Sequence, residues 1–188
     1  DDDEEGAMEE YSAAMEAFPD DPRPFLLMGR YLRETGAPAE AAEVLEAALP
    51  LLDEDRPDWS FLEALGLALH EAERDDEAAV YLDQVISFFV SRRRGDQTID
   101  YPPATAVARA EIYEAQGRLE KAADLWRGLA SGGDKANHLV YHRETARLVL
   151  ELGLEDEARR MLTRALALAE DDAAQKAEIE AQLAELEA

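Results

Sequence analysis

The stretch Ala106–Ala130, AVARAEIYEAQGRLEKAADLWRGLA, decides the fold of this chain. Its apolar side chains recur every three or four residues on either side of Gly117, which predicts two amphipathic helices joined by a turn at the glycine. Degraded copies of the same pattern occur before and after it. We therefore interpret the stretch as one unit of a helical repeat that extends over most of the 188 residues.

Small residues mark the register of this repeat. Gly29, Gly66, Ala110 and Ala146 occupy equivalent places, and each is followed at constant intervals by an alanine, a large apolar residue and a further apolar residue. Small side chains are expected where two helix backbones touch, and large ones where the space between helices is filled. The three sets are Ala41, Ala78, Ala122 and Ala158; Leu45, Leu82, Trp126 and Leu162; and Ala48, Val85, Leu129 and Ala165.

The pattern resembles the tetratricopeptide repeat, in which W-x2-L-G-x2-Y is followed by alanine, phenylalanine and proline within about 34 residues. Glycines lie where that family turns from its first helix to its second, at Gly36, Gly117 and Gly153, whereas the second repeat has Glu73 there. The hairpin of that repeat therefore departs most from the family. The residues that match the motif are Phe25, Leu26, Leu27, Met28, Gly29 and Leu32; Leu62, Leu65, Gly66 and Leu69; and Ala110 with Tyr113.

The resemblance implies an all-α fold, a right-handed α-solenoid that forms one domain over residues 1–188. Four helix hairpins are expected between an extra N-terminal helix and a C-terminal capping helix. The expected parts are the N-terminal helix at 4–18, repeat 1 at 22–55, repeat 2 at 57–92, an inserted loop at 93–102, repeat 3 at 103–136, repeat 4 at 137–171 and the capping helix at 172–188.

Two helices carry apolar side chains whose packing follows from their spacing. The stripe of Met8, Tyr11, Met15 and Phe18 is expected to place one face of the N-terminal helix on its neighbour. Phe88 precedes the inserted loop and cannot share the core face of its helix. Either Tyr101, Pro102 and Pro103 cover Phe88, which is the favoured alternative, or it is an exposed contact point.

The charge of the chain restricts its partners. Forty-four acidic residues against 19 basic ones give a net charge of −25, which disfavours nucleic acid and anionic membrane surfaces as partners. The excess of carboxylates with few lysines resembles proteins of salt-adapted organisms, although acidic helical repeats also occur without that cause. The absence of cysteine excludes disulfides and thiolate metal sites.

The sequence contains no run of about 18 apolar residues and no opening signal segment, so a soluble protein is expected. The compartment stays open, with the cytoplasm slightly favoured over the periplasm or secretion. The chain begins DDDEEG without an initiator methionine, which suggests a processed chain or a fragment of a longer one.

No motif for catalysis, a cofactor or a metal is evident, and we expect a protein that is not an enzyme. His138 and His142 have the helical spacing of a metal pair, but the segment HLVYH lacks the glutamate of zinc peptidases. His142 aligns with the core tryptophan of the repeat family, so a packed His142 and a loop-exposed His138 are expected. The tripeptide Arg94-Gly95-Asp96 resembles an integrin-binding motif and is interpreted as a solvated turn.

By the resemblance, the first helix of each hairpin lines a concave groove that binds proteins or peptides. Relatives that clamp the carboxylate tail of chaperones use lysine and asparagine there, and both are absent here. The candidate partner-binding residues are Arg23, Leu26, Arg30, Arg33, Glu63, Leu67, His70, Val107, Glu111, Glu114, Arg143 and Arg147. We expect a non-catalytic scaffold; the alternatives are a self-assembly module and a regulatory domain of a larger protein.

Two arginine pairs suggest the charge of the partner. Arg30 with Arg33, and Arg143 with Arg147, each project from one helix face, and paired guanidinium groups suit a segment that presents carboxylates. Apolar contacts between the pairs are expected from Leu26, Leu67 and Val107. The alternative is that the arginines are neutralised within the array by Glu63, Glu111, Glu114 and Glu144.

Overall fold

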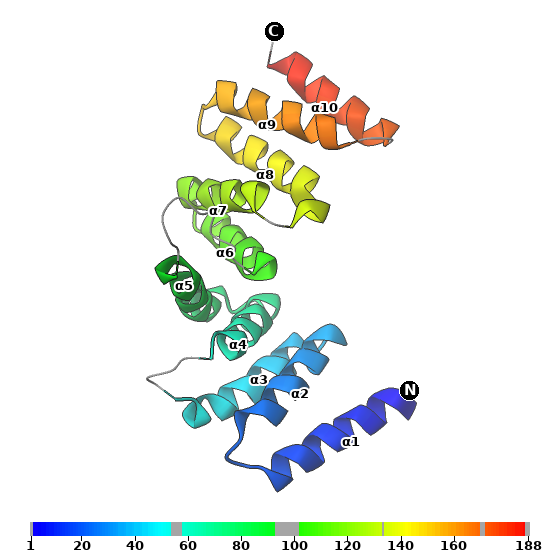
Figure 1. Cartoon of the computed structure of the whole chain (residues 1–188), viewed down its shortest axis with the longest axis vertical. Helices are drawn as coiled ribbons and strands as arrows, with labels where there is room; N and C mark the ends of the chain where they lie inside the picture. Colours follow the sequence, from blue (N-terminus) through cyan, green and yellow to red (C-terminus); the bar gives the residue numbers. More distant parts are fainter. Residues whose placement is uncertain (1, 54–57, 93–101, 133, 170–171, 187–188) are drawn as a thin grey trace. The chain divides into compact units, whose positions relative to one another are not determined.

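The computed structural model describes residues 2–53, 58–92, 102–132, 134–169 and 172–186. Over these residues the fold is all-α, with two short 3-10 turns and no strand, as the resemblance implied (Figure 1). The helices are α1 (Asp2–Ala17), α2 (Pro22–Glu34), α3 (Pro38–Ala48), α4 (Trp59–Glu71), α5 (Asp75–Ser91), α6 (Pro103–Ala115), α7 (Leu119–Ser131), α8 (His138–Glu151), α9 (Glu155–Leu168) and α10 (Ala173–Glu185).

The chain divides into two compact units, Asp1–Phe88 and Phe89–Ala188, which are described separately. The prediction that residues 1–188 form one domain stays a prediction. Among the helices in the described part of the chain, none combines the length and the apolar character that are needed to cross a bilayer.

The first unit contains the hairpins α2/α3 and α4/α5, with α1 packed on α2. Within each hairpin a glycine of the first helix meets a leucine of the second: Gly29 lies against Leu45, and Gly66 lies against Leu82. Both leucines are fully buried. The close approach of the helices at these glycines confirms the register that was predicted for repeats 1 and 2.

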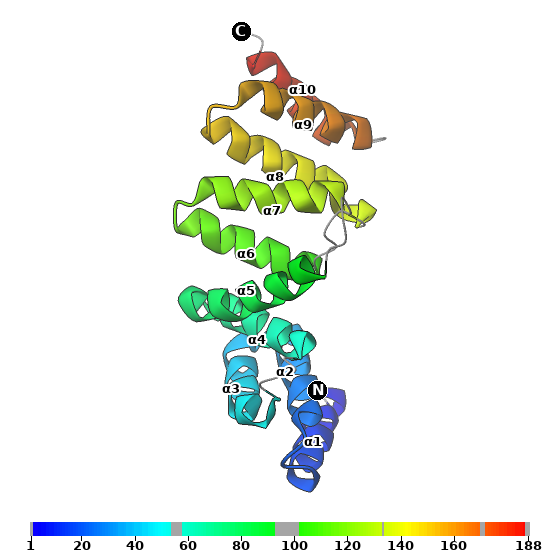
Figure 2. The same ribbon diagram turned by 60° about the vertical axis from the view of Figure 1, so that its left-hand side comes forward.

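The second unit stacks α6, α7, α8 and α9 in chain order and places α10 on α9 (Figure 2). Ala122 and Ala158, which were predicted to lie between helices, are fully buried. The large residues at the next predicted positions, Trp126 and Leu162, are also buried. The register predicted for repeats 3 and 4 is therefore confirmed.

All four hairpins turn through a residue with positive φ. Three of these residues are the predicted glycines, with φ of 69° to 85°, and the fourth is Glu73 at φ 60°. Around Glu73 the N–H of Arg74 donates to the Leu69 carbonyl at 2.8 Å and the N–H of Glu73 donates to the His70 carbonyl at 2.9 Å, which is the Schellman pattern of a helix end. The second repeat therefore makes the same turn without glycine.

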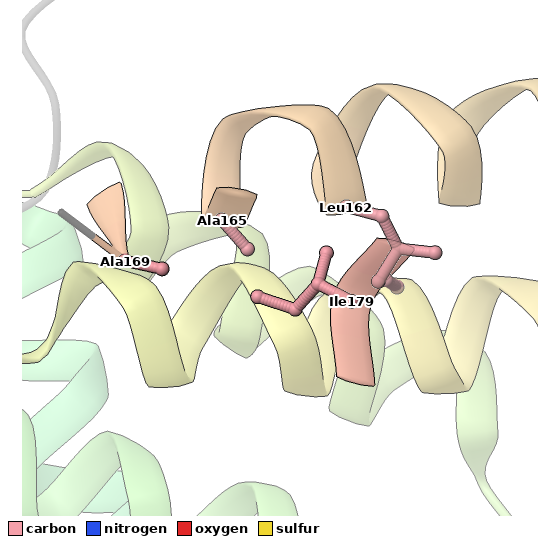
Figure 3. Close-up of a cluster of buried hydrophobic side chains, with 5 residues drawn as sticks. Leu162, Ala165, Ala169 and Ile179 are labelled. Atoms are coloured by element: carbon pink, nitrogen blue, oxygen red, sulfur yellow. The ribbon is translucent and has the colours of Figure 1, made fainter. Parts of the chain in front are cut away.

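Helix α10 closes the second unit. Ile179 on α10 is fully buried in a cluster with Ala146, Leu162, Ala165 and Ala169 (Figure 3). Leu183 and Leu186 pack against the same cluster, and the rest of α10 is mostly exposed. Since α10 covers an apolar face and itself presents polar and small side chains, it has the properties expected of a capping helix.

Local features determine the ends of helices α1, α3 and α10. Helix α3 stops at Ala48 and continues as a 3-10 turn, because Pro50 has no N–H to donate along the helix. Helix α1 ends at Ala17, and Phe18 just beyond it is 61% exposed instead of completing the predicted stripe, although Tyr11 does contact Tyr31 of α2. Helix α10 begins one residue late, since Asp172 is its N-cap.

The expectation that Tyr101, Pro102 and Pro103 cover Phe88 stays a prediction, because Tyr101 lies outside the described residues. The Phe88 ring is half-buried and stacks on Trp59 of α4, with the ring centroids 6.2 Å apart. Trp59 belongs to the same hairpin, so the partner helix contributes to the cover of Phe88. Tyr101 and Arg94-Gly95-Asp96 lie outside the described residues.

Candidate functional site

The second unit contains a hollow between α6 and α8, with a volume of about 620 Å³. This size falls within the usual range of ligand-binding clefts, roughly 300 to 1,000 Å³. We name it the α6–α8 hollow. It is lined by Pro103, Ala104, Val107, Glu111 and Glu114 of α6, by Trp126 of α7, by Asp134 and Asn137, and by Val140, Tyr141, Glu144 and Arg147 of α8.

Two aromatic side chains in the hollow are fixed by hydrogen bonds to carboxylates. The indole N–H of Trp126 donates to Oε1 of Glu114 at 3.1 Å, and the hydroxyl of Tyr141 donates to Oδ2 of Asp134 at 2.8 Å. The two rings lie 6.0 Å apart and are both almost fully buried. Their polar groups are thus satisfied, and the two rings form a rigid, packed wall behind this side of the hollow.

The same contacts fix the charge states of two groups. Hydrogen bonds from Asn137 and Tyr141 lower the pKa of Asp134, so this carboxylate is ionised at neutral pH. Burial and the neighbouring Asp134 carboxylate raise the pKa of Tyr141 to about 12, so its hydroxyl keeps its proton. The Tyr141–Asp134 hydrogen bond therefore persists across the physiological pH range.

Arg147 of the α6–α8 hollow contacts several carboxylates. Arg147 donates to Glu114 at 2.5 Å, to Glu144 at 2.9 Å and to Glu151 at 3.1 Å. Glu111 and Asp134 add two further carboxyl groups to the lining. Among the described lining residues, carboxylates therefore outnumber the guanidinium group of Arg147, which is held by the protein's own side chains.

A second hollow, of about 500 Å³, lies on the other side of α8, between it and α10. We name it the α8–α10 hollow. It shares Glu144 and Arg147 with the first. Its remaining lining residues are Arg143, Ala146, Leu150 and Glu151 of α8, Leu162 of α9, and Gln182, Glu185 and Leu186 at the C-terminal end.

The structure brings together four of the sequence-predicted site residues, Val107, Glu111, Glu114 and Arg147, in the α6–α8 hollow. Arg143 lines the α8–α10 hollow and pairs there with Glu178 of α10. The groove face predicted for α6 and α8 thus does line a concave surface within the second unit.

The predicted residues of the first unit lie on α2 and α4. Arg30 donates to Oγ of Ser60 at 2.7 Å, and Arg33 lies 3.7 Å from Glu71, so both arginines reach from α2 to α4. Burial raises the pKa of Glu71, against the effect of Arg33. At the N-terminal end of α2, Arg23 is largely exposed and pairs with Asp21, the N-cap.

The other predicted residues of this unit differ in exposure. Leu67 is buried, with 6% of its surface exposed, so it offers little area to a ligand. Leu26 and Glu63 are half-buried. The ring of His70 is also half-buried, and its Nδ1 atom lies 2.7 Å from Oδ1 of Asp75 at the start of α5.

Every predicted groove arginine has an acceptor on this chain. Four contact carboxylates and Arg30 contacts a hydroxyl. For Arg147 the acceptors include Glu114 and Glu144, which were two of the residues named in the alternative hypothesis. This geometry favours the alternative that the arginines are neutralised within the array.

His138 and His142 both belong to α8, and neither side chain is fully exposed. His142 is 6% exposed, its Nδ1 atom has no hydrogen-bond partner in the described part of the chain, and burial lowers its pKa. The expectation of a loop-exposed His138 is wrong, because this residue is half-buried at the first position of α8, where its Nε2 atom lies 3.1 Å from the Gly132 carbonyl oxygen. Among the described residues no cluster of three or more histidine, aspartate and glutamate side chains could hold a metal ion.

The lining residues of the α6–α8 hollow that sequence reasoning missed include Trp126, Asp134, Val140 and Tyr141. Trp126 was assigned only to the core, which is correct for its ring but omits the indole edge that reaches Glu114. Val140 is an apolar residue of α8 that sequence reasoning did not assign to the groove, and the structure leaves its side chain 49% exposed. The contact of Asp134 with Tyr141 depends on the turn before α8 and had no sequence signal.

The arrangement of helix hairpins defines a class of protein. The fold is that of the tetratricopeptide-type helical repeats. No protein-family model matches the sequence, and no curated protein matches it either.

Solved structures of this fold cover nearly the whole chain. A crystal structure of MamA is 21% identical, with a TM-score of 0.72 over 91% of this chain and 91% of that one. MamA from Desulfovibrio magneticus RS-1 is 17% identical, with a TM-score of 0.71 over 89% of this chain and 88% of that one. YrrB, a TPR protein with an unusual peptide-binding site, is 15% identical, with a TM-score of 0.71 over 95% of this chain and 84% of that one.

Proposed function

We propose that the chain is a non-catalytic scaffold that binds a peptide segment of a partner protein in the α6–α8 hollow. The observation that carries the proposal is a concave site in which an apolar side chain, Val140, is 49% exposed and a second one, Val107, is half-buried. Behind them the buried rings of Trp126 and Tyr141 are held by hydrogen bonds to carboxylates, so the site is rigid and binding costs little conformational entropy. The likeness to YrrB, a TPR protein with a peptide-binding site, supports the same reading.

The sequence predicted a partner that presents carboxylates to the groove arginines. Arg143 and Arg147 would have to release Glu178, Glu114 and Glu144 before they could bind the carboxylates of a ligand. The geometry therefore supports a binding site on this face of α6 and α8, and it gives less support to a ligand that presents carboxylates. Replacing Arg147 with glutamine tests the earlier prediction, since an acidic ligand would lose affinity.

Self-association is the second candidate function, and the first unit supplies the observation that favours it. Phe18 and Leu27 are 61% and 51% exposed, although both are large apolar side chains. Light scattering over a range of protein concentrations separates the two functions, because a self-assembly module associates without any ligand.

A display selection of peptides against the whole chain tests the peptide-binding proposal. Selected peptides should bind the Val140→Asn variant about tenfold more weakly, because the exchange removes an apolar contact without changing charge. The matched control is Leu168→Asn, which alters a 41% exposed leucine of α9 that lines neither hollow. Equal losses in both variants, or no enriched peptide, would overturn the proposal.

A further inference from the structure

We propose that the second unit carries a docking site for an acidic segment of a partner protein, at the edge where its hairpins turn. The site is a hollow of about 360 Å³ beside the turn from α6 to α7, and we name it the α7-turn hollow. None of its described lining residues belongs to the α6–α8 hollow, so the inference goes beyond the proposed function. The lining consists of Gly117, Arg118, Leu119, Glu120 and Lys121 at the turn and the start of α7, and of Leu152 at the end of α8.

The described lining contains two cationic side chains, Arg118 and Lys121, and both are exposed. Within the described part of the chain neither of them forms an ion pair with a carboxylate. Arg118 instead donates to the uncharged Oε1 atom of Gln116, at 3.5 Å. By contrast, Arg74 and Arg127 of the same array each contact two carboxylates. Arg118 and Lys121 therefore keep a charge that is available to a ligand.

The ring of Tyr113 on α6 brings these two cations together. Cζ of Arg118 lies 4.7 Å from the centroid of the ring, and Nζ of Lys121 lies 5.6 Å from it. The guanidinium group of the buried Arg109 lies over the same ring, at 3.7 Å. An aromatic ring attracts cations without cancelling their charge, because it carries no net charge itself. Three cations thus surround one ring in a chain whose net charge is −25.

Comparison of the repeats indicates that the fold does not require a cation at position 121. Lys121 directly precedes the buried Ala122 and lies in the first turn of α7. There the helix dipole favours an acidic side chain and disfavours a basic one. Lys121 therefore reverses the charge that the other repeats carry, at a place where it does not stabilise its own helix. The equivalent residues, which precede Ala41, Ala78 and Ala158 in the first turns of α3, α5 and α9, are Glu40, Glu77 and Glu157.

The side chains around the cations specify the ligand further. Leu119 and Leu152 are half-buried in the same lining and offer apolar surface beside the charges. Glu120 is exposed there as well, and it forms no ion pair with either cation in the described part of the chain. A segment with two adjacent carboxylates next to an apolar side chain matches this arrangement, since Arg118 and Lys121 can each bind one carboxylate. A long polyanion does not, because the net charge of the chain repels it along its whole length.

Two blocked peptides, which share two leucines and carry either two glutamates or two glutamines between them, test the inference in nitrogen-15 NMR spectra of the whole chain. The glutamate peptide should shift the backbone amide signals of Gly117 and Lys121 along a saturable curve, and the glutamine peptide should leave them in place. About 1 M salt should weaken binding of the glutamate peptide, because the screening length falls to roughly 3 Å. Equal shifts with both peptides, or no shift with either, would overturn the inference. So would a shift of the Trp126 indole signal in place of these amides, which would support the α6–α8 hollow instead.

Matched variants locate the effect. Arg118→Gln combined with Lys121→Gln should weaken binding of the glutamate peptide about fivefold or more. Arg160→Gln combined with Arg164→Gln removes two exposed arginines of α9 outside the described lining of the hollow, and it should have no effect beyond experimental error. Equal losses in the two double variants would contradict the inference, because the net charge alone would then explain the binding.

The melting temperature of the single variant Lys121→Gln separates a binding role from a structural one. Because the helix dipole disfavours the lysine, the variant should melt at the temperature of the parent or above it. A lower melting temperature would mean that Lys121 serves the fold, and it would overturn the assignment of this residue to a binding site.

Discussion

Gly29 on α2 and Leu45 on α3 lie so close that a Cβ atom added to the glycine would stand 2.5 Å from Cγ of the leucine. Leu45 is fully buried, so it has little room to move aside. We expect Gly29→Ala to lower the free energy of unfolding by about 1 to 3 kcal/mol, because overpacking outweighs the gain in helix propensity. Urea denaturation of the variant measures the change.

Gly6 provides the control for this substitution. It lies within α1, and a Cβ atom built on it meets no heavy atom within 4 Å. Gly6→Ala should therefore raise the free energy of unfolding by roughly 0.5 to 1 kcal/mol, as expected for glycine replaced in an open helix. If both exchanges were stabilising, the tight packing of α2 on α3 would be wrong.

Glu73 holds a left-handed backbone conformation that ordinary side chains disfavour. Glu73→Gly should stabilise the chain by about 1 kcal/mol, which corresponds to roughly 2 to 4 °C in the melting temperature of a protein this size. Gly117→Glu makes the opposite exchange at the equivalent turn, where φ is 69°, and should destabilise by a similar amount. Changes of the same sign in the two variants would contradict the equivalence of the turns.

Ile179 carries the capping role of α10. Its side chain is fully buried, so Ile179→Ala should lower the free energy of unfolding by about 2 to 4 kcal/mol. Glu180→Ala, at the next and exposed position, should stay within about 0.5 kcal/mol of the parent. Removing residues 172–188 should have the same effect as Ile179→Ala or a larger one, with aggregation of the exposed face. A melting temperature that is unchanged in the Ile179→Ala variant would rule out α10 as a cap.

The burial of His142 leads us to predict how the stability of the protein depends on pH. Burial, and then the charges of Arg164 and His138, lower its pKa in the folded state below the ordinary value of 6.5. The folded protein therefore binds fewer protons than the unfolded chain below about pH 6.5, and stability falls as the pH is lowered through that value towards the folded pKa. His142→Phe removes this contribution.

Melting temperatures of the parent and of the His142→Phe variant, compared between about pH 7.5 and 5, test the prediction. The parent should lose more stability than the variant over this range. Carboxylate titration affects both proteins alike, so the difference between them isolates His142. Parallel curves would mean that the imidazole is solvated.

Much of the fold could be predicted because the repeat specifies it through residue size. Gly29 and Gly66 leave room for a leucine of the next helix to lie against them, which fixes the register of each hairpin. The structure shows both contacts as expected. Details that residue size does not specify depend on single local features. Helix α3 ends in a 3-10 turn that contains Pro50, and the Trp59 ring reaches across its hairpin to stack on Phe88.

The candidate site was less predictable than the core. Helical periodicity placed Val107, Glu111, Glu114 and Arg147 on one surface correctly, since these positions follow from the repeat. It could not show that Arg147 would bind Glu114 on another helix, because the ends of long side chains are not fixed by register. Asp134 lies in the turn before α8, where it accepts a hydrogen bond from Tyr141, and the sequence does not specify the conformation of this turn.

The central claim is that the α6–α8 hollow receives the partner segment, and the indole N–H signals of the two tryptophans test it most directly. Trp126 lies in the hollow and Trp59 is stacked on Phe88, so comparison with a Trp59→Phe variant assigns the two signals in a nitrogen-15 NMR spectrum. During titration with a selected peptide, the Trp126 signal should shift with the binding curve and the Trp59 signal should stay in place. A bound peptide that moves Trp59 alone, or neither signal, would contradict the account.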